Sequence, residues 1–199
     1  MALADPLLPE GDGHTPLGDD DIYGLIPTYI TTRGELNAAE QDNVAHALTL
    51  ASPSQPDQVL DHVYLRRLHK QMFGDVWDWA GQYRPSEMSI GIDPVAIPMA
   101  VVDLCEDARL WMKASGEEDL AAARFHHRLV LIHPFRNGNG RHARRAADVL
   151  LVSAGIDAFT WGANADLSPD DLRSRYLTSL RNADHDPDDL TELVEFARS

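Results

Sequence analysis

A histidine followed by a glycine-bearing, arginine-rich loop is the part of this 199-residue sequence best equipped for chemistry. The segment from His133 to Arg144 reads HPFRNGNGRHAR. Gly138 and Gly140 can adopt positive φ values and leave the main chain bare, so successive N–H groups can converge on a phosphate. A helix that opens just after them would add the positive end of its dipole. The spacing therefore predicts an anion site.

The side chains of this loop can supply the reactive groups. Arg141 and Arg144 are three residues apart, so on a helix they share one face and can reach the same polyphosphate. His133 titrates near neutral pH and can serve as a general base. Phe135 is expected to point into the core and fix the loop. Together these residues favour transfer chemistry on a phosphorylated substrate.

The charge distribution supports a local anion site. The formal net charge is -15, which argues against direct binding of nucleic acid, because that affinity depends on cations that neutralise phosphates. Residues 120–147 nevertheless contain no Asp or Glu and are rich in arginine, whose planar fork suits phosphate oxygens. No apolar run is long enough for a membrane helix, and the N-terminus lacks the pattern of a secretory signal. We therefore expect a cytoplasmic protein, with Cys105 as a small buried hydrophobe.

Two other interpretations of the same segment are weaker. An apolar run, the two glycines and Asp157 imitate a dinucleotide-binding fingerprint. Five residues separate that run from Gly138, however, and no later strands are expected that could form a doubly wound sheet. Zinc binding is disfavoured by the absence of paired-histidine spacings and of a cysteine or carboxylate partner. The histidines concerned are His126, His127, His133 and His142.

The remaining sequence predicts a mainly helical protein. Residues 1–22 read as a flexible acidic tail, residues 23–58 as a helical extension and residues 59–199 as the core with C-terminal helices. Asn37 and Glu40 are typical of a capping box, which would open a helix ending near residue 50. Ser168 and Pro169 are typical of another helix start. Further helices are expected at 59–74, 99–113, 120–132, 141–154 and 190–196.

One strand signal and one aromatic cluster complete the expected core. Residues 86–92 and 95–97 are short β-prone runs on either side of Asp93-Pro94, which favours a small hairpin. Trp77, Trp79 and Tyr83 are expected to anchor the packing of the core.

The loop resembles the signature of the Fic family, His-x-Phe-x-acid-Gly-Asn-Gly-Arg-x-x-Arg, at every fixed position except one. The run HKQMFGDVWDWAGQYR, from His69 to Arg84, is similar to the Fic stretch that precedes the target-binding hairpin, and Met88 to Pro98 would be that hairpin. The resemblance extends over about residues 59–185. The spelling HPFRNGNGRHAR, with TTRGELN from Thr31, is most similar to the subgroup called mobile mystery protein B.

This resemblance implies a Fic fold, which is a helical bundle with a small β-hairpin flap beside the active-site loop. It also implies a protein adenylyltransferase, a nucleotidyltransferase that moves AMP from ATP to a hydroxyl side chain of a target protein. His133 would be the catalytic base. The flap that binds the target would be Met88, Ser89, Ile90 and Gly91. The residues that bind nucleotide phosphates would be Arg136, Gly138, Asn139, Gly140, Arg141 and Arg144.

Asn137 is the exception to the signature. It occupies the position where the family usually places the carboxylate that binds Mg²⁺. An amide oxygen can bind a hard cation but adds no negative charge, so the resemblance implies Mg²⁺ at a weakened site. Three outcomes follow: slower AMP transfer, a different nucleotide or phosphoryl-type donor on the same fold, or a regulatory module that binds nucleotide without turnover.

The resemblance also suggests how the protein is controlled. Many Fic proteins are inhibited by a helix with the pattern Ser/Thr-x-x-x-Glu-Gly/Asn, whose glutamate pairs with the second arginine of the signature. Thr31 and Glu35 have this spacing, but Leu36 follows where Gly or Asn is usual. Glu35 is therefore the candidate inhibitory residue. The subgroup further implies a toxin-like protein of a mobile element, with a helix-turn-helix or antitoxin-like partner.

Overall fold

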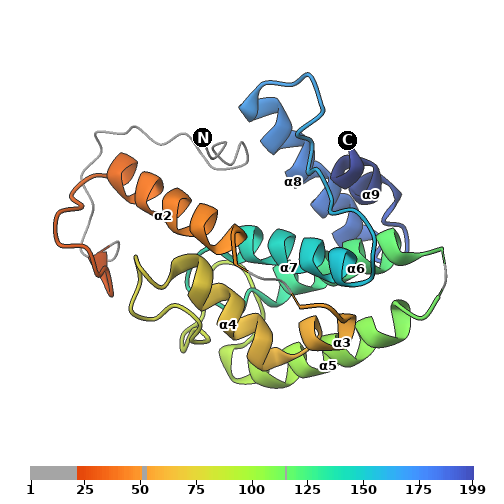
Figure 1. Ribbon diagram of the computed structural model, residues 1–199, viewed down its shortest axis with the longest axis horizontal. Coiled ribbons are helices and arrows are strands. Elements are labelled where there is room, and N and C mark those ends of the chain that lie inside the picture. Colours follow the sequence, from red (N-terminus) through yellow and green to blue (C-terminus); the bar gives the residue numbers. More distant parts are fainter. Residues whose placement is uncertain (1–21, 51–52, 115) are drawn as a thin grey trace.

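The computed structural model describes residues 22–50, 53–114 and 116–199, and this part of the chain is mainly helical (Figure 1). An isolated β-bridge pairs Leu25 with Trp77, and the described residues form no strand. The expectation of a mainly α protein is confirmed, whereas the expected tail lies outside the described residues except for Ile22. The helices are α2 (Arg33–Leu48), α3 (Pro56–Val59), α4 (His62–Phe73), η1 (Pro94–Ala96), α5 (Ile97–Trp111), α6 (Glu118–Ile132), α7 (Asn139–Ser153), α8 (Pro169–His185) and α9 (Thr191–Arg198).

Local capping explains where the helices begin. The capping box of α2 is formed by Thr32 and Glu35, so the expected box at Asn37 and Glu40 was wrong by about one turn. At the start of α8 the expected cap is confirmed, because Ser168 accepts a hydrogen bond from the Asp171 N–H. The helical period over 59–74 is divided into α3 and α4, since the Asp61 side chain accepts from the Val63 N–H and starts a new helix.

The expected β-hairpin is not present. Among residues 86–97 no strand forms, and the second β-prone run is a 3₁₀ turn that leads into α5. The Asp93 side chain accepts a hydrogen bond from the Val95 N–H, and Pro94 fixes a helical φ value at the first position of that turn. Capping chemistry therefore outweighs β propensity here, and Met88–Gly91 lie in an irregular loop.

Helices α6 and α7 form the centre of the fold, side by side (Figure 1). Alanines 121–123, 143, 146 and 147 are buried along these two helices, and such small side chains let helix backbones approach closely. One cluster of buried apolar residues joins α6 and α7 to α2, α4 and α5, and a second joins them to α8 and α9. The loop between α6 and α7 is therefore held by two cores.

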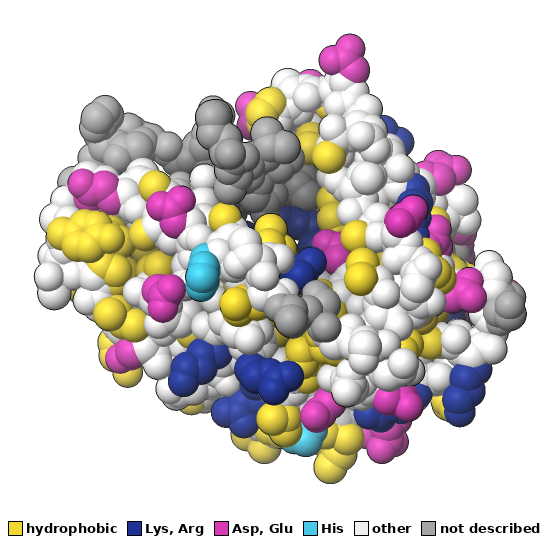
Figure 2. Space-filling view, viewed as in Figure 1, with side chains coloured by type: hydrophobic (Ala, Val, Ile, Leu, Met, Phe, Trp, Pro, Cys, Tyr) yellow, Lys and Arg dark blue, Asp and Glu magenta, His cyan; other side chains and the backbone are white. Residues whose placement is uncertain are grey.

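Acidic side chains are scattered over the visible face, among uncharged and apolar ones (Figure 2). Basic side chains gather below its centre, where Figure 1 places α4, whose exposed cations include Arg66, Arg67 and Lys70. Cys105 is buried, as expected, and burial raises the pKa of its thiol to about 12. None of the helices in the described part of the chain combines the length and apolar character of a membrane span.

Candidate active site

The loop between α6 and α7 has two left-handed residues at its ends. His133 ends α6 with a φ of 51°, and Gly138 precedes α7 with a φ of 77°. A Cβ atom on Gly138 would lie 2.4 Å from the Phe73 ring, so only glycine fits. The N–H groups of Asn139, Gly140 and Arg141 form the first turn of α7, where a helix has no acceptors of its own. The loop thus presents main-chain donors to an anion.

Buried side chains hold this loop in shape. Asn139 is 3% exposed, and its amide both donates to the Phe135 carbonyl (2.8 Å) and accepts from the Phe135 N–H (2.9 Å). The Asn139 side chain is thereby committed to Phe135, and its main-chain N–H lies in the first turn of α7. Phe135 is fully buried, as expected, and stacks on His69 with ring centroids 3.7 Å apart. These contacts give the loop the rigidity that accurate positioning requires.

His69 connects the loop to the core in a fixed tautomer. Its Nδ1 accepts from the Gly81 N–H (3.0 Å), so the hydrogen is on Nε2, which donates to the Asn137 carbonyl (3.0 Å). Burial lowers the pKa of His69 well below its usual range, which keeps the ring neutral. Sequence reasoning assigned no role to His69, since its spacing from the loop gives no signal.

His133 combines partial burial with a neutral ring. Burial lowers the pKa of its imidazole; the Val130 carbonyl acts in the opposite direction, and the Arg84 charge lowers the pKa further. Nδ1 is buried, and we assign the ring hydrogen to this nitrogen because the Val130 carbonyl is an acceptor beside the ring, which His126 lacks among the described residues. Nε2 is therefore the nitrogen that can meet a substrate, and at neutral pH it carries a lone pair.

Arg84 ties the irregular loop to His133. It is 2% exposed, and its guanidinium donates to the carbonyls of His133 (2.7 Å), Ser86 (2.8 Å) and Ile92. Gly91 lies beneath it, with a φ of 109°, and a Cβ there would lie 2.6 Å from Arg84 Nη2 and 2.7 Å from His133 Cβ. The expected flap therefore lies next to the histidine although it contains no strand.

Glu40 of α2 reaches into the loop from the opposite side. It is 3% exposed, and Oε2 accepts from Arg141 Nη2 at 2.5 Å. Its other oxygen, Oε1, accepts from Trp77 Nε1 (2.7 Å) and from Asn137 Nδ2 (2.9 Å). One buried carboxylate thus occupies a guanidinium that was expected to bind phosphate. Sequence reasoning took Glu40 for a surface capping residue, and only the packing of α2 reveals this role.

Glu35, the expected inhibitory residue, lies at the exposed start of the same helix. Its carboxylate accepts hydrogen bonds from the main chain of Thr31 (2.8 Å) and Thr32 (3.1 Å). These bonds lower its pKa. Glu35 thus acts as a capping residue in this structure, and Glu40 makes the contact with an arginine of the loop.

Arg144 and three further histidines of α6 and α7 have partners within the fold. Arg144 is 8% exposed and lies over the Tyr176 ring of α8, 5.3 Å from its centroid. His126 contacts the Tyr176 hydroxyl (3.0 Å), His127 contacts Asp184 Oδ1 (2.8 Å) and His142 contacts the Leu65 carbonyl (2.9 Å). These histidines thus have separate structural partners.

A cavity of about 650 Å³ opens beside the loop. Such a volume is within the range of small-molecule sites. Asn137 and Arg136 form one wall, and Met88 of the irregular loop forms another. The cavity is further lined by Tyr23, Arg33, Leu36, Trp77, Trp79, Arg84, Ser86 and Glu87. Its cations outnumber its single carboxylate, so it favours anionic groups.

The structure brings most of the predicted site residues together. The glycines of the loop and Arg141 lie at the start of α7, His133 lies at the other end of the same loop, and Arg136 and Asn137 face the cavity. Arg144 lies on the α8 side of the same helix, and Met88–Gly91 approach through Arg84.

Comparison with known proteins identifies relatives of this loop. Residues 59–151 match the model of the Fic/DOC family. The probable protein adenylyltransferase y4lH of Sinorhizobium fredii is 33% identical over 102 residues, which is 46% of this chain and 52% of that protein. The probable protein adenylyltransferase Fic of Escherichia coli (strain K12) is 28% identical over 162 residues, 73% of this chain and 76% of that protein.

A solved structure has the same fold. The crystal structure of BepC from Bartonella tribocorum, with bound AMPPNP, superposes with a TM-score of 0.65 at 18% identity, and the match covers 89% of this chain and 95% of that one. At this identity the likeness establishes the fold alone. The chain spans about half the length of the Sinorhizobium relative and about three quarters of the Escherichia coli relative.

Proposed function

We propose that this chain, whose residues 59–151 are a domain of the Fic/DOC family, transfers the AMP group of ATP to a hydroxyl side chain of a target protein. The observation that carries the proposal is the position of His133, which sits in a left-handed turn one loop away from the open N-terminus of α7. The loop between α6 and α7 therefore carries both the base and the anion site. Two relatives are named as probable protein adenylyltransferases, which supports the same activity.

The reaction follows from this arrangement. His133 Nε2 takes the proton of the target hydroxyl as its oxygen bonds to the α-phosphorus of ATP. The bond between that phosphorus and the bridging oxygen of the β-phosphate breaks, and pyrophosphate leaves. The N–H groups at the start of α7, with Arg141 and Arg144, hold the phosphates and offset the developing charge. The BepC structure with AMPPNP supports a triphosphate nucleotide as donor.

The Mg²⁺ site implied by the family fits these residues poorly. Asn137 Oδ1 accepts from the Gly138 N–H (2.7 Å) while Nδ2 donates to Glu40, so the amide bridges two partners. Both oxygens of Glu40 also already accept from donors. Asn137 has no carboxylate, and the carboxylate of Glu40 is already hydrogen-bonded, so neither offers a free carboxylate oxygen to a hard cation. No step of the reaction is therefore assigned to a metal, and Asn137 acts as a brace.

The same contacts suggest that α2 controls the site. A phosphate that binds Arg141 must displace the carboxylate of Glu40, because both are anions that compete for one guanidinium. Glu40 is therefore the inhibitory residue in place of Glu35. In this arrangement residues 23–58 act as a helical extension that regulates the core at 59–199. A cytoplasmic setting and a helix-turn-helix or antitoxin-like partner stay predictions.

The irregular loop at Met88–Gly91 is the target-binding segment of this proposal. Met88 and Ile90 are 43% and 58% exposed, and Arg84 holds the end of the loop next to His133. An extended segment of the target that pairs with the main chain of this loop would bring its hydroxyl to His133. The family's hairpin would then form only when the target adds its strand.

Labelled ATP tests the activity directly. Wild-type protein is incubated with a cell lysate and with ATP labelled at either the α- or the γ-phosphate, and His133→Ala serves as the matched inactive variant. Covalent labelling of protein by wild type from α-labelled ATP alone supports AMP transfer. Labelling from γ-labelled ATP would instead indicate a kinase-like reaction. Nucleotide binding without any labelling would indicate a regulatory module, and labelling from another nucleotide would replace ATP as donor.

A further inference from the structure

Two polar groups from different helices meet at Gly140. A Cβ atom on Gly140 would lie 3.9 Å from Arg144 Nη1 and also 3.9 Å from the hydroxyl oxygen of Tyr176. Arg144 belongs to α7, whereas Tyr176 comes from α8. Gly140 lies in the first turn of α7, where helix N–H groups face outward. The phenol of Tyr176 therefore borders the anion site, a role that the α8 sequence does not indicate.

Tyr176 is held in place from both sides. It is 6% exposed, the Arg144 guanidinium lies over its ring, and its hydroxyl lies 3.0 Å from His126 Nε2 of α6. Arg144 and His126 come from different helices, and both contact this residue. Their shared contact is this one phenol.

The partners of the two ring nitrogens of His126 show which group donates in its hydrogen bond with Tyr176. His126 is completely buried, and its Nδ1 has no hydrogen-bond partner in the part of the chain that the structure describes. A buried N–H without an acceptor is costlier than a lone pair without a donor. The hydrogen is therefore on Nε2, which donates to the Tyr176 oxygen. The hydroxyl hydrogen of Tyr176 is then directed away from His126.

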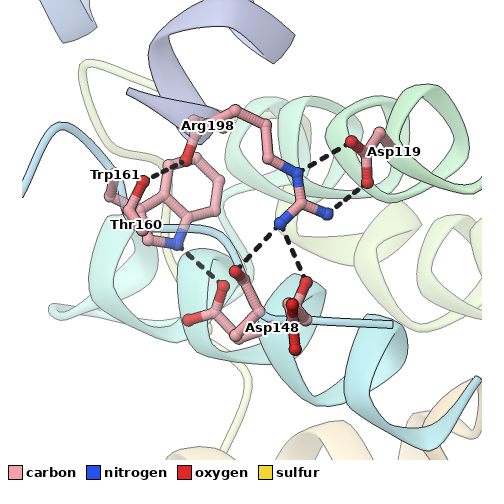
Figure 3. A network of polar contacts seen from close by, with 8 residues as sticks. Asp119, Asp148, Thr160, Trp161 and Arg198 are labelled. Carbon is pink, nitrogen blue, oxygen red and sulfur yellow. Dashed lines mark hydrogen bonds and ion pairs between the residues drawn. The ribbon is translucent and has the colours of Figure 1, made fainter. Parts of the chain in front are cut away.

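A polar network behind His126 keeps its ring in position. The His126 ring lies against Trp161, with centroids 4.7 Å apart, and Trp161 Nε1 donates to Asp148 Oδ1 at 2.8 Å. Figure 3 shows this bond, with Arg198 nearby donating to both oxygens of Asp119. Burial and the nearby Arg144 charge lower the pKa of His126 well below its usual range, so the ring stays a neutral donor.

We propose that the Tyr176 hydroxyl is a further phosphate-binding group, which donates a hydrogen bond to the terminal phosphates of the nucleotide beside Arg144. His126 is its positioning residue and sets the direction of the hydroxyl. The proposal rests on the proposed function, because it assumes a nucleotide with its β- and γ-phosphates at the start of α7. It predicts that Tyr176 discriminates ATP from AMP.

Calorimetric binding of ATP and of AMP tests this assignment. Both ligands are measured in the Glu40→Gln background, in which the carboxylate that competes for Arg141 is neutral. Tyr176→Phe removes only the hydroxyl and is expected to raise the Kd for ATP about tenfold while the Kd for AMP stays unchanged. Tyr64→Phe, which removes the hydroxyl of another buried tyrosine, is the matched control and should change neither.

A second pair of variants tests the positioning residue. His126→Gln keeps an N–H donor near the Tyr176 oxygen and should retain ATP affinity, whereas His126→Leu removes the donor and should weaken ATP binding. ATP affinity unchanged in Tyr176→Phe would overturn the inference and leave the proposed function standing. Equal weakening of ATP and AMP would also overturn it, as a purely structural effect. Failure of the background protein to bind ATP would refute the proposed function and the inference with it.

Discussion

The contact between Glu40 and Arg141 makes the sharpest prediction, through the substitution Glu40→Gln. The glutamate is buried, and its carboxylate accepts hydrogen bonds from Arg141, Trp77 and Asn137. Glutamine has the same shape and keeps one oxygen as acceptor, but it removes the negative charge that opposes Arg141. The substitution therefore separates the shape of the contact from its charge.

Glu40→Gln is expected to lower the stability of the free protein and to raise its affinity for ATP. Removing one partner of a buried ion pair costs about 3–5 kcal/mol, and we expect the lower end because glutamine can still accept one bond. The free protein should thus lose about 3 kcal/mol of unfolding free energy. A charge-assisted hydrogen bond contributes about 1.5–3 kcal/mol, so freeing Arg141 for phosphate should tighten ATP binding at least about tenfold.

Thermal unfolding with and without ATP, together with calorimetric Kd values, measures both effects in the same samples. Saturation at about 100 times the Kd adds about 2.7 kcal/mol of stability, so ATP should restore most of what Glu40→Gln loses. Glu35→Gln is the matched control on the same helix. Glutamine at this position can still accept from the main chain of Thr31 and Thr32, so the helix cap should be kept and ATP affinity should stay unchanged.

Two results would refute this reasoning. If Glu40→Gln weakened ATP binding, Glu40 would be holding Arg141 in its productive position rather than blocking it. If Glu35→Gln instead tightened ATP binding and raised labelling, the original expectation for Glu35 would be correct, and the ion pair of Glu40 would be a structural contact.

Four further changes have defined outcomes. Asn137 Nδ2 lies 2.9 Å from Glu40 Oε1, so Asn137→Asp places a second carboxylate beside the first and should expel Glu40. Labelling should then become more dependent on Mg²⁺ in a metal titration, and an unchanged titration curve would contradict this. Because burial lowers the pKa of His133, kcat/KM for labelling should rise with pH through a value below 6.5 and be level at higher pH; a rising limb above 6.5 would exclude His133 as the base. Gly91→Ala should displace the loop, because the added Cβ introduces strain of about 1–3 kcal/mol. Labelling should fall about tenfold or more, while calorimetry should show unchanged ATP affinity. Burial raises the pKa of Asp148 from 3.8 to about 6, so the fold loses stability as pH rises between these two values. In denaturant unfolding, the free energy of unfolding of Asp148→Asn should match that of wild type near about pH 4 and exceed it by up to about 3 kcal/mol near about pH 8.

Several elements of the fold could be read from the sequence because their causes are local. Ser168 and Pro169 start α8 as expected, since capping depends on residues only a few positions apart. Phe135, Trp77 and Trp79 are buried, as large apolar side chains next to a functional loop usually are. The hairpin expected at residues 86–97 was wrong, because Asp93 and Pro94 start a helical turn and none of the described residues forms a strand beside the loop.

Part of the conformation of the loop from His133 to Arg144 was also readable in advance. Gly138 has the positive φ value that its sequence context indicated, and α7 begins at Asn139, two residues before the expected start at Arg141. The role of Asn139 differed in detail. Its side chain braces Phe135, and its main-chain N–H lies in the first turn of α7. A local pattern shows that an asparagine is required there but does not show which of its groups is used.

By itself, the sequence determined the loop from His133 to Arg144, because glycine conformations, a helix start and the arginine spacing are all encoded within twelve neighbouring residues. The tertiary structure alone decided what surrounds that loop. Glu40 lies 101 positions from the arginine it contacts, and Tyr176 reaches Gly140 only because α8 packs against the central helices. Contacts of this kind depend on how helix faces pack, and a single sequence carries no local signal for them.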